Sequence, residues 1–182
     1  MNDLYLVSLA ASITALVFAW LQSKKVLAFS EGTPLMQKIS RAIRTGASAF
    51  LKRQYRTVAI FFACMFAVLC GMAAAGFVTW FVPFAFVTGG FFSGLSGFIG
   101  MTIAPRANCR TAAAAQEGLN RGLRIAFSAG SVMGFTVVGL GLLDISLWYA
   151  VMKLIFHSSL EEITAAMITF GMGASSMALF AR

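Results

Sequence analysis

Charged residues are scarce in this sequence of 182 residues, where they make up 11%, and hydrophobic residues make up 59%. A soluble domain carries roughly a quarter charged residues. The shortage therefore excludes an ordinary soluble domain and indicates an integral membrane protein. The net charge of +8 would suggest a nucleic-acid partner in a soluble protein, but the positions of the charges, given below, predict that no nucleic acid is bound.

Residues that build metal and catalytic centres are also few. The chain has one histidine, His157, three cysteines and six acidic residues. Cys64, Cys70 and Cys109 show no metal-binding spacing and are expected to be reduced, small packing residues. The acidic residues form no cluster at helical spacing that could hold Mg²⁺, and His157 has no partner. We therefore predict no catalytic residue and no metal site within this chain.

Long apolar stretches are what the sequence does have. A bilayer core is crossed by roughly 20 apolar residues in a helix. The expected fold class is all-α, a polytopic transmembrane helix bundle of five spans. The first stretch has an acidic front and is followed by Lys24 and Lys25, so it is expected to be an uncleaved helix and not a signal peptide. The five expected spans are Leu4–Gln22, Thr57–Trp80, Val82–Ala104, Leu123–Tyr149 and Ile163–Arg182.

The basic residues predict the orientation of these spans. Thirteen of the 14 basic residues fall on one side of the predicted topology, in the 23–56 and 105–124 regions and at Arg182. Only Lys153 falls on the other side. Since lysine and arginine are retained on the cytoplasmic side, the N-terminus and His157 are expected outside, in a plasma or bacterial inner membrane. The connection between the second and third spans is expected to be a tight outer turn at Phe81.

The 33–56 segment has a different pattern. Thr33 and Pro34 are typical of a helix start. Apolar residues then recur at helical spacing, with the basic residues mostly off that stripe. We expect a basic amphipathic helix at the inner interface, either as a surface helix preceding the second span or as a binding site for an anionic partner.

Small residues and two charges mark the spans themselves. GxxxG motifs at Gly90–Gly94 and Gly130–Gly134 favour close helix packing. Asp144 lies near the outer end of the fourth span, where an interfacial carboxylate close to water is expected. Arg182 follows a full span of apolar residues; it is either a snorkelling arginine at the inner edge or an arginine that faces the bundle interior, as in ion pathways.

Several segments together resemble one family, the membrane-bound, ion-translocating pyrophosphatases. The resemblance covers the chain from about residue 30 to its end, and depends on the order and spacing of the segments. They are Arg44-Thr-Gly-Ala-Ser-Ala-Phe-Leu-Lys-Arg-Gln-Tyr55, Gly97-Phe-Ile-Gly-Met-Thr-Ile-Ala104, Arg106-Ala-Asn-Cys-Arg-Thr-Ala112, Gly118-Leu-Asn-Arg-Gly-Leu-Arg-Ile-Ala-Phe127, Gly130-Ser-Val-Met-Gly134 and Gly173-Ala-Ser-Ser-Met-Ala-Leu-Phe-Ala-Arg182.

The resemblance implies that residues 1–182 are the first part of a sixteen-helix pump that works as a homodimer. Such a pump hydrolyses Mg²⁺-pyrophosphate at the cytoplasmic side and moves H⁺ or Na⁺ outward. In the family, the arginine that matches Arg182 is followed by a glycine run and by TKAADVGADLVGK, whose acids hold Mg²⁺ and substrate. The resemblance also implies that Arg182 lies in the ion-coupling region.

Two hypotheses follow from these observations. In the first, the chain is a piece of a pyrophosphate-energised pump and is inactive alone, because it lacks the metal-binding acids. In the second, it is a small standalone membrane protein without catalysis, such as a scaffold or transporter subunit. The pattern leaves open the choice between H⁺ and Na⁺ and any dependence on K⁺.

Overall fold

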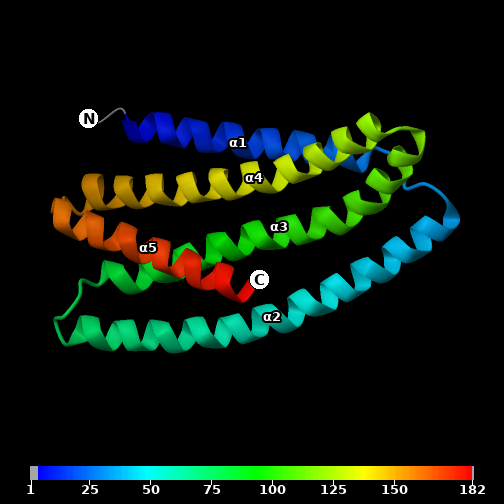
Figure 1. The fold of residues 1–182 in the computed structure, drawn as a ribbon. Coiled ribbons are helices and arrows are strands. Elements are labelled where there is room, and N and C mark those ends of the chain that lie inside the picture. Colours follow the sequence, from blue (N-terminus) through cyan, green and yellow to red (C-terminus); the bar gives the residue numbers. More distant parts are fainter. Residues whose placement is uncertain (1–3, 182) are drawn as a thin grey trace.

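The computed structural model describes residues 4–181, and every regular element in them is helical. Five helices are long and apolar enough to cross a membrane, so the predicted all-α bundle of five spans is confirmed. A short π-helix extends the fourth (Figure 1). The elements are α1 (Leu4–Leu27), α2 (Pro34–Ala74), α3 (Phe81–Glu117), α4 (Leu119–Ala150), η1 (Val151–Ile155) and α5 (Leu160–Ala181).

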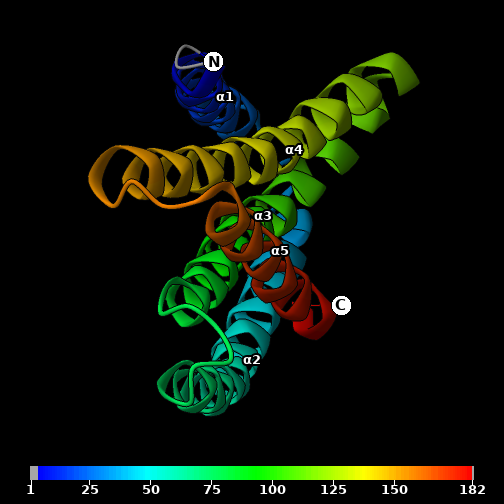
Figure 2. The ribbon, with the colours of Figure 1, turned by 90° about the vertical axis from the view of Figure 1, so that its left-hand side faces the viewer.

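The helices are arranged around α3. α1 packs on α4, α4 packs on α3, and α3 also contacts α2 and α5. Seen end-on, α1, α4, α3 and α2 follow one another in a row, with α5 beside α3 (Figure 2). α3 therefore has neighbours on three sides and contributes the largest number of buried residues, whereas most of α2 is exposed.

The second helix differs from the expected pair of elements. Thr33 is its N-cap, accepting a hydrogen bond from the amide of Met36, and Pro34 is the first helical residue, as predicted. No break follows: the 33–56 segment and the second span form one helix of 41 residues, which is about 60 Å long at 1.5 Å per residue. No Gly or Pro stop separates the two halves. That the 33–56 half lies at the membrane interface stays a prediction.

The turn between α2 and α3 is longer than expected. A connection at Phe81 alone was predicted, but α2 ends at Ala74 and residues 75–80 join it to α3. Gly76 has a φ of +82°, and the amide of Phe77 donates to the carbonyl of Met72. This is the usual way in which a left-handed glycine ends a helix. The expectation was wrong because the residues after Gly76 are also apolar, so hydropathy alone extended the predicted second span beyond the end of the helix.

Residues 105–122, which lie between the third and fourth expected spans, are mostly helical. α3 continues through Pro105 to Glu117, and the single residue Gly118 separates it from α4. The stretch after Pro105 is rich in alanine, the best helix former, and Gly118 has a φ of +149°. Because the two helices meet at one residue, the basic residues of this region lie on helices, not in a flexible loop.

At the other side, α4 passes into η1, and α5 begins a few residues later. Ser159 and Glu162 form a capping box, in which each side chain accepts a hydrogen bond from the other's amide. His157, in the connection, has a φ of +51° and is exposed.

The helix directions gather the connections at two ends (Figure 1). The α1–α2 and α3–α4 connections lie at one end, here called the basic end, and the connections at 75–80 and 156–159 lie at the other. Lys24, Lys25, Lys38, Arg41, Arg44, Arg106, Arg110, Arg121 and Arg124 all belong to helix segments next to the basic end.

Candidate functional site

The residue that the sequence singled out, Arg182, lies outside the described residues. The structure describes the helix that leads to it, and α5 is helical up to Ala181. α5 packs along α3, and the ring of Phe180 lies 4.9 Å from that of Phe61 on α2. The segment before Arg182 therefore runs beside both α2 and α3.

The α3–α5 contact is made by backbone against backbone. A Cβ added to Gly89 would lie 2.3 Å from the carbonyl oxygen of Phe170. On the facing helix, a Cβ added to Gly173 would lie 2.1 Å from the carbonyl oxygen of Phe86. The hydroxyl of Ser93 donates to the carbonyl of Ala174 at 3.1 Å. Only glycine fits at these two positions, so the helices approach as closely as small residues permit.

A cluster of three charges ties the basic end together. One carboxylate oxygen of Glu31, in the α1–α2 connection, lies 2.5 Å from Arg44 of α2 and 3.0 Å from Arg110 of α3. Arg110 also donates to the carbonyls of Phe29 and Arg106, and its side chain is only 9% exposed. We call Glu31, Arg44 and Arg110 the charge clamp. It joins the connection to both helices.

The charge clamp has a clear electrostatic consequence. The hydrogen bond from Arg44 holds the pKa of Glu31 below its ordinary range, and the positive charges of Arg44 and Arg110 act in the same direction. Sequence reasoning missed this cluster because its members are far apart in the chain: Glu31 is 13 residues before Arg44, and Arg110 is 66 residues after it. A lone acid in a strongly basic region was the only available signal.

Asp144 is buried, not exposed at the interface as expected. It is 2% exposed, and its Oδ2 has no hydrogen-bond partner among the described residues. The hydroxyl of Thr88 on α3 is a polar neighbour, and this hydroxyl accepts a hydrogen bond from Trp148 at 2.8 Å. α4 lies between α1 and α3. This packing buries the carboxylate of Asp144, which its position near the end of the fourth span had predicted to lie close to water.

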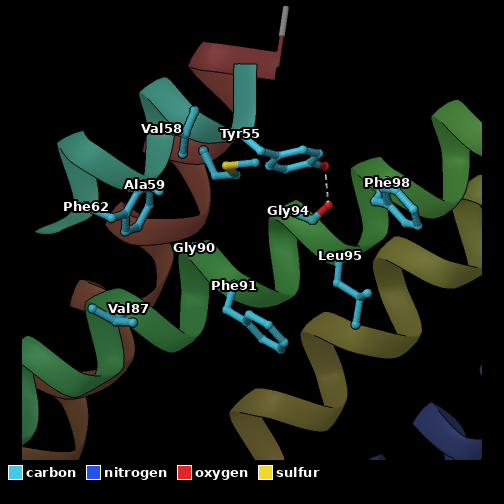
Figure 3. Close-up of a pocket in the computed structure, with 11 residues that line it drawn as sticks. Tyr55, Val58, Ala59, Phe62, Val87, Gly90, Phe91, Gly94, Leu95 and Phe98 are labelled. Carbon is cyan, nitrogen blue, oxygen red and sulfur yellow. Dashed lines mark hydrogen bonds between the residues drawn. The ribbon is translucent and has the colours of Figure 1, made fainter. Parts of the chain in front are cut away.

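A groove runs between α2 and α3 (Figure 3). Its volume is about 380 Å³, Met177 of α5 also lines it, and its walls are apolar except for Tyr55. The hydroxyl of Tyr55 crosses from α2 to donate to the carbonyl of Gly94 at 2.6 Å. Gly90 faces the ring of Phe62, not a backbone, so α2 is held away from α3 by an aromatic side chain.

The donors needed for hydrolysis of a phosphate compound do not come together here. Among residues 4–181, no three His, Cys, Asp or Glu side chains lie close enough to hold a metal ion. The acids that are packed, Glu31 and Asp144, are on different elements, and Glu31 is committed to two arginines. The three cysteines are free thiols, of which Cys64 is exposed and Cys109 buried. The described residues thus do not fit a Mg²⁺ site.

Comparison with known proteins identifies the family. The family described as "Inorganic H+ pyrophosphatase" matches residues 13–182. A protein of Bacteroides thetaiotaomicron, named "Putative K(+)-stimulated pyrophosphate-energized sodium pump", is 52% identical over 94% of this chain and 24% of its own length. A "K(+)-insensitive pyrophosphate-energized proton pump 2" of Moorella thermoacetica is 42% identical over 99% of this chain and 26% of its own.

A third relative matches at lower identity. A "K(+)-insensitive pyrophosphate-energized proton pump" of Methanosarcina mazei is 36% identical over 94% of this chain and 24% of its own length. The chain spans about a quarter of the length of these curated relatives. The family match covers nearly all of this sequence and the same segments that carried the resemblance. The chain belongs to the inorganic H⁺ pyrophosphatase family.

Proposed function

We propose that this chain is the N-terminal part of a pyrophosphate-energised pump that couples cytoplasmic hydrolysis of pyrophosphate to outward transport of H⁺ or Na⁺. The observation that carries the proposal is the family match over residues 13–182, together with five helices able to cross a membrane. Relatives named as sodium pumps and as proton pumps both match, so the proposal covers both ions.

In this proposal, the chain contributes helices and not the hydrolytic centre. The described acids do not assemble a metal site, and phosphoryl transfer needs metal ions and a positioned water. The ligands for Mg²⁺ therefore lie in the part of the pump that this chain does not cover. We expect the purified chain to release no phosphate from Mg²⁺-pyrophosphate, whereas the full-length protein releases phosphate and fills vesicles with ions. Hydrolysis by the chain alone would contradict the proposal.

Arg182 is proposed as an ion-coupling residue. The family resemblance supports this role, and so does the position of α5, on which Ala174 and Met177 contact α3 and Phe180 lies against Phe61 of α2. A charge at membrane depth requires a partner. Lysine keeps the charge but loses the planar fork that can hold two carboxylates.

The test for Arg182 compares two substitutions in the full-length protein. Arg182→Ala is expected to lower both hydrolysis and transport by about tenfold or more, since removing one member of a buried pair leaves an unpaired charge. Arg182→Lys is expected to retain hydrolysis better than transport. Phosphate release and ion uptake into vesicles are measured on the same preparation. Arg182→Ala with both activities at the parent level would show that Arg182 is only a snorkelling edge residue.

The proposed orientation has the basic end in the cytoplasm, following the positive-inside rule. Single cysteines at Gln116 and His157, both exposed positions on opposite ends of the bundle, test it in a cysteine-free background. A membrane-impermeant reagent added outside should label the cysteine at position 157 only. Labelling of position 116 instead would reverse the topology. The homodimer is proposed from the family resemblance and is tested by the mass of the full-length protein in detergent.

A further inference from the structure

The groove between α2 and α3 continues beyond the part drawn in Figure 3. A second cavity of about 370 Å³ lies toward the basic end between the same two helices. Tyr55 and Phe98 line both cavities. The two cavities are therefore neighbouring parts of one groove that runs along the bundle from its apolar middle to its basic end.

The polarity of this groove changes along its length. In the cavity of Figure 3, Tyr55 is the only lining residue with a polar side chain. The cavity toward the basic end is lined by three cations and, besides Tyr55, by two hydroxyl side chains. On α2, Arg44, Ser48 and Lys52 are spaced four apart, and on α3 Thr102 and Arg106 are spaced likewise. Residues four apart share a helix face, so two polar ladders face each other across the groove.

These cations have hydrogen-bond donors that no described residue uses. Lys52 and Arg106 form no ion pair among the described residues, and both are exposed. Arg44 gives one of its nitrogens to Glu31, but its Nε is buried without a partner. The basic end of the groove thus offers several hydrogen-bond donors and an excess of positive charge. A purely apolar helix packed against it would leave these charges unpaired.

We propose that the α2–α3 groove binds one anionic glycerophospholipid. Its phosphate would lie between Lys52 and Arg106, with the hydroxyls of Ser48 and Thr102 beside it. An acyl chain would follow the apolar wall past Phe98 and Leu95 toward Ala59. A lipid in a bilayer presents charge at the interface and hydrocarbon deeper, which is the polarity of this groove. Basic pockets between transmembrane helices bind anionic headgroups for this reason. The inference requires only membrane insertion and does not depend on the proposed pumping.

The test uses the full-length protein, delipidated in mild detergent and titrated with phosphatidylglycerol or with phosphatidylcholine of the same acyl chains. Native mass spectrometry counts the lipids retained. The headgroup variant is Lys52→Gln with Arg106→Gln. The control is Lys38→Gln with Arg41→Gln, which removes the same charge from exposed positions of α2 that do not line the groove. A third variant, Ala59→Phe, fills the apolar part.

We expect the parent to retain one phosphatidylglycerol about tenfold more tightly than phosphatidylcholine. The headgroup variant should lose this preference, and the control should keep it. Ala59→Phe should weaken retention of both lipids, and inorganic phosphate in excess should not displace the lipid. Equal affinity for the two lipids, equal loss in the headgroup variant and the control, displacement by free phosphate, or a helix of the same protein or of a second copy found in the groove would each overturn the proposal.

Discussion

α3 contacts α5 and α2 through neighbouring glycines, and the two contacts turn out differently. Gly89 meets the backbone of Phe170 on α5, and Gly173 of α5 meets the backbone of Phe86 on α3, so the two helices approach closely. Gly90 meets the ring of Phe62 on α2, and a groove remains beside it. A small residue on one helix therefore permits close packing only where it meets the backbone of the facing helix and not the end of a large side chain.

The two contacts are also held by different forces. The α3–α5 contact depends on dispersion between close backbones and on one serine hydrogen bond. The α2–α3 contact is fixed at separate points, by the hydroxyl of Tyr55 on Gly94 and by the charge clamp at the basic end. The first contact should be sensitive to added volume, and the second to loss of single polar groups.

The largest effect is expected for Gly173→Leu, which forces a side chain against the carbonyl of Phe86. Overpacking of this kind costs roughly 3 kcal/mol. Gly171→Leu is the control, since Gly171 has open space around it. Thermal unfolding of the full-length protein in detergent measures both variants. Equal unfolding temperatures for the two would show that the α3–α5 contact is looser than described.

Next in size is the charge clamp. Arg110→Met leaves the carbonyl of Phe29 without its donor and Glu31 with one arginine. We expect a loss of about 2 kcal/mol. The comparison is Arg121→Met, which removes an exposed pair with Glu117 and should cost under about 0.5 kcal/mol. Urea or thermal unfolding distinguishes them; similar losses would mean that the clamp is no stronger than a surface ion pair.

Tyr55→Phe sharpens the comparison within the groove. It removes the hydrogen bond to Gly94 and keeps the ring. The expected cost is about 1 kcal/mol. Tyr149→Phe serves as the control, because the structure shows no hydrogen bond to the Tyr149 hydroxyl among the described residues. If Tyr55→Phe unfolds at the parent temperature, the α2–α3 contact does not depend on this bond.

The smallest effect is a pH dependence. The arginines lower the folded-state pKa of Glu31 below its ordinary 4.5. A lowered carboxyl pKa stabilises the fold at pH values above the ordinary pKa, and this contribution is lost as the pH falls through the folded-state pKa. The unfolding temperatures of the parent and of Glu31→Gln, measured from about pH 7 to about pH 3, should therefore converge at the acid end. A difference in unfolding temperature that stays constant with pH would show that the ionisation of Glu31 does not contribute to stability.

The sequence by itself determined the membrane architecture. Runs of apolar residues must form internally hydrogen-bonded helices in lipid, so length and hydropathy predicted the five spans. Thr33 and Pro34 predicted the start of α2 for an equally local reason, because the cap satisfies the amides of the first helical turn. The order of the motifs also identified the family that the comparison confirmed.

Only the tertiary structure decided which surfaces meet. The burial of Asp144 required α1 and α3 to cover α4. The charge clamp required the α1–α2 connection to lie against the last turns of α3, far away in sequence. The difference between Gly89 and Gly90 was set by the group opposite each of them, which is the backbone of Phe170 for Gly89 and the ring of Phe62 for Gly90. Hydropathy is summed along a single segment, whereas burial, ion pairing and close approach depend on the partner that the fold brings near.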